Sequence, residues 1–278
     1  MNKQGKNGIE WCTYTWSPVT GCLHGCEYCY AEKIARRFGG GKNDKAIHYL
    51  GEPMYKQKKN GLASYGSDMM IDPYPFGFTP TFHKYRLGEP QQVKKPQKIF
   101  VVSMGDLFGE WVPDEWIEEV FAACKKAPQH TYLFLTKNPS RYWQLHDKGI
   151  LPDKNNYWYG TTLTHGKDEH RVANNLPAYT GLPKPTFRNT FVSAEPILDN
   201  IEGMHPMGGF FTYYPRTIKW AILGAETGNR KDKVIPERKW IENIVSACRK
   251  ANVPVFMKDS LKDLMGDDFI QEWPEGLK

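Results

Sequence analysis

The sequence lacks any long hydrophobic run. None of its apolar stretches approaches the roughly 20 residues that a helix needs to cross a membrane, so we expect no membrane partner. Residues 1–8 are polar and lack the apolar segment of a secretory signal, which favours a cytoplasmic protein. The chain also has no internal repeat and no low-complexity segment, and its length suits a single domain, 1–278.

Cysteine and net charge are both modest. Only six of the 278 residues are cysteine, and three of these fall between positions 22 and 29. A secreted disulfide framework is usually a shorter chain with denser cysteine, so this clustering favours metal binding in a reducing compartment. The formal net charge of +6 favours an anionic substrate or a nucleic acid without identifying one.

Short, apolar, β-branched runs alternate with amphipathic stretches along most of the chain. The predicted strands are 9–15, 99–104, 131–136, 157–163, 190–194, 220–223 and 253–257. The predicted helices begin near Pro113, Pro139, Asp168 and Pro236. This alternation is typical of a parallel sheet with right-handed crossovers. The sequence therefore predicts an α/β fold, a partial or near-complete (β/α) barrel of the TIM type, with its active site at the carboxyl ends of the strands.

One long segment, about 39–97, interrupts the alternation after the first helix. It is rich in Gly, Pro, Tyr and Lys and shows no sustained periodicity. A segment of this length inside a compact domain is usually functional or disordered, and its many aromatic residues argue against disorder. We expect a packed insertion that covers the mouth of the active site.

Three cysteines dominate the chemistry of the sequence. Cys22, Cys26 and Cys29 are spaced x3 and x2, on a loop between the first predicted strand and the helix that follows. Gly21 and Gly25 allow the tight turns that aim three sulfurs at a common point. Three thiolates bind three corners of a [4Fe–4S] cluster and leave the fourth iron open to a further ligand.

A zinc site is the alternative, with His24 as the fourth ligand. Zinc sites usually pair two Cys-x2–4-Cys units, and no second unit is present. His24 also sits between two of the cysteines, which is an awkward place from which to complete a tetrahedron. We therefore favour the open cluster.

The pattern Cys-x3-Cys-x2-Cys, with the aromatic Tyr28 just before the last cysteine, resembles the signature of the radical S-adenosylmethionine (SAM) superfamily. The flanking stretches WSPVTGC, CYA, SMGDLF, LTKNP, SAEP and GAETG are similar to a phage-associated branch of that superfamily. The resemblance covers nearly the whole chain. Many relatives in that branch have a longer spacing between the first two cysteines, whereas this chain has the ordinary superfamily spacing.

The resemblance implies that SAM binds the open iron through its methionyl amine and carboxylate. Transfer of one electron then breaks the S–C5′ bond, and the 5′-deoxyadenosyl radical takes a hydrogen atom from the substrate. The electron comes from a donor protein such as flavodoxin or ferredoxin. The core motif leaves open whether the enzyme is an isomerase or mutase, a lyase or a transferase.

Further cofactor-binding candidates follow from their places at strand ends. The resemblance implies that the turn at Met104, Gly105 and Asp106 receives the SAM amino group and that Tyr28 lies near the adenine. Lys137 is a candidate partner of the SAM carboxylate or of a substrate anion. The remaining candidates for SAM or substrate are Thr161, Thr162, Ser193, Glu195, Gly224 and Glu226. These side chains have alternative roles: they can form turns, pack at the strand ends or lie exposed to solvent.

The other three cysteines divide into two kinds. Cys124 and Cys248 fall on apolar helical stripes and are expected in the core. Cys12 belongs to the predicted N-terminal strand, where its thiol is a candidate hydrogen-atom donor to a product radical. A core position is its alternative role.

The substrate class rests on charge and aromatic residues. Two basic clusters stand out, one between residues 83 and 98 and one between residues 230 and 239. The first cluster lies in the insertion, whose aromatic residues suit stacking on bases. The resemblance to a phage-associated branch implies a nucleotide or DNA-base substrate. The alternative from another class is a zinc- or cluster-stabilised nucleic-acid-binding protein without catalysis.

Overall fold

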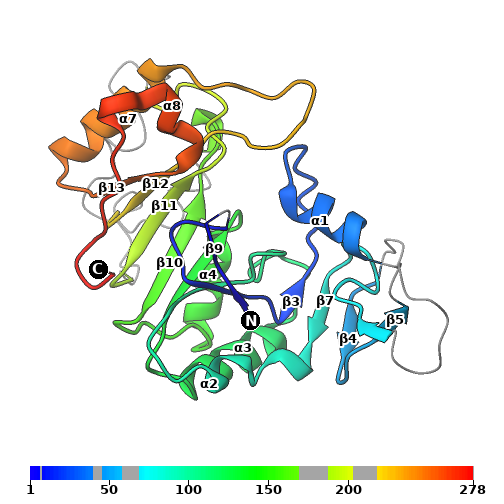
Figure 1. Cartoon of the computed structure of the whole chain (residues 1–278). Coiled ribbons are helices and arrows are strands. Elements are labelled where there is room, and N and C mark those ends of the chain that lie inside the picture. Colours follow the sequence, from blue (N-terminus) through cyan, green and yellow to red (C-terminus); the bar gives the residue numbers. More distant parts are fainter. Residues whose placement is uncertain (7, 40–45, 58–68, 169–186, 203–217, 278) are drawn as a thin grey trace.

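The computed structural model is an α/β protein built on one eight-stranded sheet (Figure 1). It describes residues 1–6, 8–39, 46–57, 69–168, 187–202 and 218–277. The strands follow the order β1-β2-β8-β9-β10-β11-β12-β13, and every neighbouring pair is parallel except β1 with β2. Their bounds are β1 Asn2–Lys3, β2 Tyr14–Trp16, β8 Lys98–Val101, β9 Thr131–Thr136, β10 Tyr157–Thr162, β11 Thr190–Ala194, β12 Ala221–Leu223 and β13 Val255–Met257.

The parallel strands match the seven that the sequence predicts, and two of them differ in extent by three residues or more. The predicted strand 9–15 is wrong over most of its length, because only Tyr14–Trp16 pairs in the sheet, as β2. The predicted strand 99–104 ends as β8 at Val101, since Val102 has a φ of 60°, which breaks the extended chain. Pro254 correctly indicated a sheet edge, because β13 is the last strand in the order.

Three of the described helices, α3, α4 and α7, pack against one face of the sheet. The helices are α1 Tyr30–Phe38, α2 Glu89–Gln92, α3 Asp114–Lys125, α4 Ser140–Asp147, α7 Arg238–Lys250 and α8 Lys262–Met265, with 3₁₀ turns at Lys84–Arg86, Gly166–Asp168, Asp259–Leu261 and Gly266–Asp268. The predicted helices near Pro113, Pro139 and Pro236 are confirmed as α3, α4 and α7. The helix predicted from Asp168 to Leu176 lies almost wholly outside the described residues.

Two apolar layers sandwich the sheet, because alternate strand residues point to opposite faces. On the helical face, Phe134 and Tyr159 pack with α3 and α4 in one large cluster. On the other face, here called the inner face, Phe100, Leu133 and Phe191 pack together with residues near both chain ends. The inner face is therefore apolar at its centre, and polar groups reach it only near the strand ends.

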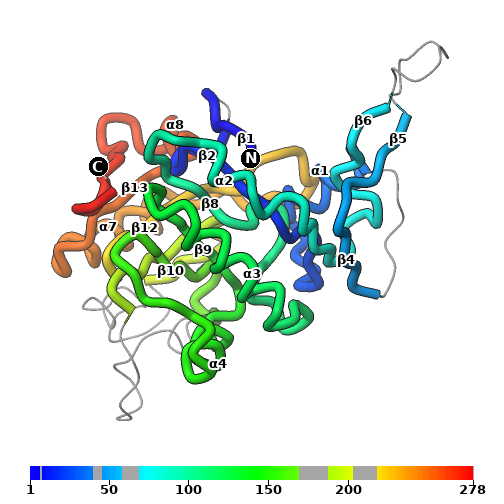
Figure 2. The backbone as a smooth tube through the Cα atoms, turned by 90° about the horizontal axis from the view of Figure 1, so that it is seen from below, coloured from blue at the N-terminus to red at the C-terminus, as the bar shows by residue number. Residues whose placement is uncertain are grey.

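The insertion is more regular than its sequence suggests. Its described parts form a two-stranded sheet, β5-β6, and supply β7 and β4 to a three-stranded sheet, β3-β7-β4, whose strand β3 precedes the cysteine loop. The bounds are β3 Val19–Thr20, β4 His48–Leu50, β5 Tyr55–Gln57, β6 Met69–Ile71 and β7 Thr81–His83. Figure 2 shows β4, β5 and β6 standing to one side of the main sheet, beyond α1.

The main sheet is open along the described strands. Strands β1 and β13 are its two edges, and no described pairing joins them. No helix in the described part of the chain has both the length and the apolar character to cross a membrane.

Gly21 supplies a direct test of how the insertion is joined to the sheet. It has a φ of +86°, and a Cβ there would lie 2.3 Å from the carbonyl oxygen of Thr79. We predict that Gly21→Ala lowers the free energy of unfolding by about 3 kcal/mol, measured by urea denaturation. Gly228→Ala is the matched control, because Gly228 has a φ of +89° but open space around it. It should cost about 1 kcal/mol, and equal losses for the two variants would refute the close contact.

Candidate functional site

The cysteine loop runs from β3 to α1 and is attached to the end of β8 by its backbone. Gly21 and Gly105 form a parallel bridge, and the Gly21 N–H donates to the carbonyl of Met104 at 2.8 Å. A Cβ on Gly105 would lie 2.6 Å from the Gly21 carbonyl oxygen. Met104 and Gly105 therefore position the loop by direct backbone contact, whatever else they bind.

The three predicted cluster ligands line one cavity. Cys22, Cys26 and Cys29 surround a space of about 180 Å³, which Phe78 and Thr79 of the insertion help to enclose. Cys29 caps the first turn of α1, and the Glu32 N–H donates to its Sγ at 3.3 Å. A helix N-terminus of this kind stabilises a thiolate. Across the described residues, no group of three or more His, Cys, Asp or Glu side chains converges on a single-ion metal site.

Burial disfavours the thiolate form of two of the loop cysteines, Cys22 and Cys29. Burial, with the nearby Asp106 carboxylate adding to it, raises the pKa of the Cys22 thiol to about 12. Burial likewise raises the pKa of Cys29. Metals bind the thiolate form, so metal binding at Cys22 and Cys29 would release protons and neutralise negative charges that burial disfavours.

Asp106 is the best-connected side chain of the site. Its Oδ2 accepts from His24 Nε2 at 2.8 Å and from the hydroxyl of Thr136 and the N–H of Lys137 at 3.0 Å each. Its Oδ1 accepts from the Phe108 N–H at 3.0 Å. Burial acts to raise the pKa of Asp106, but these donors hold it below its usual value. The carboxylate is thus engaged by the chain itself, and it ties the cysteine loop to the ends of β8 and β9.

His24, the zinc ligand of the alternative interpretation, is committed elsewhere. Its Nε2 bonds Asp106, and its ring lies edge-on to Trp111 with 4.9 Å between centroids. In this arrangement the imidazole holds the loop and does not complete the cysteine set.

Tyr28 and Lys137 come together at the end of β9. The Lys137 ammonium lies 5.5 Å from the centroid of the Tyr28 ring, within cation–π range. The Tyr28 hydroxyl hydrogen-bonds Thr164, and burial raises its pKa. The sequence placed both residues in the site separately, and the structure makes them neighbours.

The two threonines of β10 face opposite ways. The Thr161 hydroxyl donates to the carbonyl of Thr136 at 3.3 Å on the helical side of the sheet. Thr162 pairs with Ser193 of β11, and both belong by strand alternation to the inner face. The Ser193 hydroxyl is buried and has no hydrogen-bond partner among the described residues. An unsatisfied buried hydroxyl is costly, so Ser193 marks this face for a ligand or water.

Glu226 is buried but already paired. Its carboxylate accepts two hydrogen bonds from Arg230, at 2.7 and 2.8 Å, and these hold its pKa below the usual range. Arg230 also lies 3.7 Å from Glu27, next to Cys26. The loop after β12 therefore reaches towards α1, as Figure 1 shows.

Lys258, which the sequence interpretation missed, pairs with Glu195. The two side chains form an ion pair, and Gly224 of the intervening strand end lies against both. Lys258 directly follows β13 as Glu195 follows β11, so its place at a strand end was the signal that could have identified it.

Cys12 lies in the apolar layer of the inner face. Its Sγ is 3.7 Å from the Ile9 carbonyl, and burial raises its pKa to about 12. The thiol is therefore neutral and keeps its hydrogen. Cys124 and Cys248 are fully buried, which confirms the prediction that they belong to the core.

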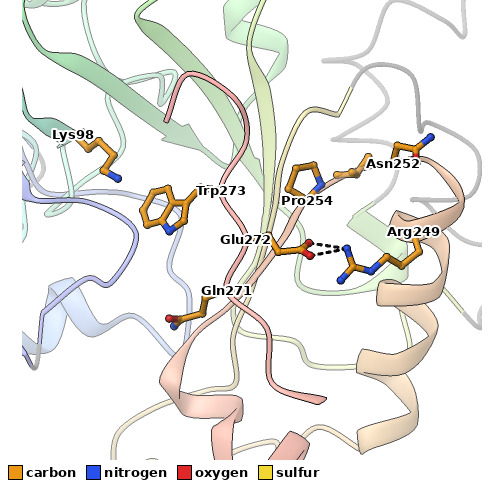
Figure 3. A pocket seen from close by; sticks show the side chains of 8 residues that line it. Lys98, Arg249, Asn252, Pro254, Gln271, Glu272 and Trp273 are labelled. Atoms are coloured by element: carbon orange, nitrogen blue, oxygen red, sulfur yellow. Dashed lines mark hydrogen bonds and ion pairs between the residues drawn. The ribbon is translucent and has the colours of Figure 1, made fainter. Parts of the chain in front are cut away.

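A larger cavity, about 650 Å³, lies at the other end of the sheet (Figure 3). It is bounded by Lys98 at the start of β8 and by Pro254 just before β13. Its charges are satisfied internally, because Lys98 lies 3.6 Å from the centroid of the Trp273 ring and Arg249 pairs with Glu272 at 2.8 Å. Active sites of β/α proteins lie at the carboxyl ends of the strands, so the cysteine pocket is the better candidate despite its smaller size.

Fold and site together define an α/β protein with three cysteines beside the carboxyl edge of a mostly parallel sheet. The chain belongs to the family described as Protein of unknown function (DUF5131), whose family model matches residues 6–263. That range includes the cysteine loop and extends past β13. No curated protein and no solved structure matches the chain.

The role of Asp106 can be tested through stability and pH. We predict that Asp106→Asn lowers the free energy of unfolding at pH 7 by about 2 kcal/mol, because its charge-assisted hydrogen bonds are weakened. The folded-state pKa of Asp106 is lowered, so its contribution is complete above the unfolded pKa of about 4 and is lost as pH falls below it. Urea denaturation should therefore show the variant and the wild type converging below about pH 4.

The exposed Asp267→Asn is the control for removal of a charge. This variant should have the same free energy of unfolding at pH 7 as the wild type, and the same dependence of that free energy on pH. A constant difference between Asp106→Asn and the wild type at every pH would contradict the assigned ionisation.

Proposed function

We propose that the protein is a radical SAM enzyme whose [4Fe–4S] cluster is held by Cys22, Cys26 and Cys29. The observation that supports this most is the single cavity lined by all three thiols, on a loop attached to the carboxyl ends of β8 and β9. Three cysteines without a fourth protein ligand suit a cluster with one open iron. The chemistry of the donor set therefore fits the group.

The fold supports the same proposal at a coarser level. Seven parallel strands with helices on one face are compatible with a partial (β/α) barrel, in which the inner face of the sheet is the interior. In that interpretation Cys12, Ser193 and Glu195 belong to the barrel interior, while the cysteine loop lies over its mouth.

When bound, the cluster supplies the electron that cleaves SAM to the 5′-deoxyadenosyl radical, which takes a hydrogen atom from the substrate. The chain contributes binding and orientation. Cys22, Cys26 and Cys29 hold the cluster, and the Glu32 N–H supports the Cys29 thiolate. Asp106 fixes the loop and bonds Lys137 only through the backbone N–H. The side-chain ammonium of Lys137 can therefore pair with the carboxylate of SAM or of a substrate. An external donor such as flavodoxin or ferredoxin provides the electron.

The inner face supports a hydrogen-transfer role for Cys12. Its neutral thiol keeps the S–H bond that a hydrogen-atom donor requires, and the surrounding apolar layer excludes water. The net charge of +6 supports an anionic substrate such as a nucleotide or a DNA base.

Anaerobic reconstitution tests the proposal. We predict that the wild type takes up about four irons per chain, turns brown, and releases 5′-deoxyadenosine when reduced in the presence of SAM. Cys22→Ala, Cys26→Ala and Cys29→Ala should each abolish both properties, because three thiolates are the whole protein contribution to the cluster. Iron analysis, absorbance and chromatography of the nucleoside provide the measurements.

Cys124→Ala is the matched control, since it removes a buried thiol that lies in the helical layer. It should retain iron and SAM cleavage. One tightly bound zinc per chain with no cleavage of SAM would sink the proposal and favour a zinc-stabilised binding protein.

A further inference from the structure

Glu195 and Lys258 form an ion pair at the rim of the inner face that the proposed chemistry does not use. The two residues follow β11 and β13, and Gly224 follows β12 between them. A Cβ on Gly224 would lie 3.1 Å from Lys258 Cδ and 3.2 Å from Glu195 Cγ. Glycine therefore leaves just enough room for the pair to lie over the middle strand.

The pair is sheltered but accessible. The side chain of Lys258 is 13% exposed and that of Glu195 is 27% exposed. Burial acts to lower the pKa of Lys258, yet the carboxylates of Glu195 and Glu10 hold it above its usual value. The ammonium therefore stays charged in a partly desolvated place, where hydrogen bonds to a ligand are stronger than in water.

The pair has hydrogen-bonding capacity to spare. An ammonium has three N–H donors and a carboxylate has two oxygens. The described contacts use one donor of Lys258 and one oxygen, Oε1, of Glu195. Nearby on β11, the buried Ser193 hydroxyl has no partner in the described part of the chain. The site thus presents a donor and an acceptor side by side, with a further unsatisfied hydroxyl close to them.

We propose that Glu195 and Lys258 read the hydrogen-bonding edge of a nucleobase, an inference that rests on the proposed function. Each base carries an N–H donor beside a carbonyl or ring-nitrogen acceptor on that edge. Carboxylates can accept from a base N–H, and lysine can donate to a base acceptor. Glu195 accepts from the N–H, and Lys258 donates to the adjacent acceptor. A trans peptide bond points its N–H and C=O in opposite directions and cannot satisfy both residues at once.

Position in the sheet separates this site from the SAM site of the proposed function. The cysteine loop is attached at the ends of β8 and β9, whereas Glu195 and Lys258 follow β11 and β13. In the proposed function the methionyl group of SAM would be bound at the cluster, which would leave the pair for the substrate.

Titration calorimetry on the full-length reconstituted protein tests the inference. The probes are the 5′-monophosphates of guanosine, uridine, adenosine and cytidine, each beside an analogue N-methylated on the reading edge. These analogues are 1-methylguanosine, 3-methyluridine, N6,N6-dimethyladenosine and N4,N4-dimethylcytidine monophosphates. We predict that at least one nucleotide binds and that methylation weakens it about tenfold or more, because buried polar groups then lose their partners. Equal affinity for a nucleotide and its methylated form, or no binding of any nucleotide, would overturn the inference.

Variants test whether Glu195 and Lys258 cause this difference in affinity. Lys258→Met and Glu195→Gln should each weaken the preferred nucleotide about tenfold and remove its advantage over the methylated analogue. Lys219→Met, which removes an exposed lysine before β12, should keep both. Loss of SAM binding in Lys258→Met with nucleotide binding intact would overturn the assignment. Thermal unfolding checks that the variants are folded, and the analogue series on the wild type needs no variant at all.

The outcome is separable from that of the proposed function. If the protein cleaves SAM but binds a nucleotide and its methylated form equally well, the inference about Glu195 and Lys258 is wrong and the proposed function stands. Discrimination of nucleotides by a protein that binds no cluster would support the reading pair and remove the radical chemistry.

Discussion

One buried carboxylate organises this molecule. Asp106 is 4% exposed and would be expensive to bury as an ion without partners, yet it receives hydrogen bonds from three different segments of the chain. Those segments are the cysteine loop, the end of β9 and its own turn after β8. The position of the cysteines relative to the sheet therefore depends on a polar network, and such a network fixes geometry more narrowly than apolar contact does.

The regular part of the fold was predictable because its signals are local. Thr131–Thr136 and Thr190–Ala194 are buried β-branched or aromatic runs, and the structure assigns both as strands with the predicted bounds. Long-range contacts left no such signal. The pair of Glu195 and Lys258 joins residues 63 positions apart, and the positive φ of Val102 depends on neighbours that the sequence does not reveal. The cysteine loop was recognised from its spacing, whereas the hydrogen bond of His24 to Asp106 required the structure.

Two glutamates that follow neighbouring strands have different roles. Both oxygens of Glu226 accept from Arg230, and Oε2 also accepts from the Val234 N–H at 3.4 Å, so this carboxylate holds the loop after β12. Glu195 bonds Lys258 through Oε1 alone, and its second oxygen has no hydrogen bond among the described residues. From the sequence the two residues look alike, since each is an acidic group just past a strand. The number of oxygens already occupied distinguishes a structural carboxylate from one that can bind.

The bridge between Gly21 and Gly105 has a consequence for how this family can vary. The two backbones touch with no side chain between them, so neither position has room even for a methyl group. A substitution at one cannot be rescued by a smaller residue at the other, since glycine is already the smallest. Chains that keep this loop on this sheet are thus confined to a single residue type at both positions, whereas the loop tip at Gly25, with open space around it, requires only a backbone that tolerates positive φ.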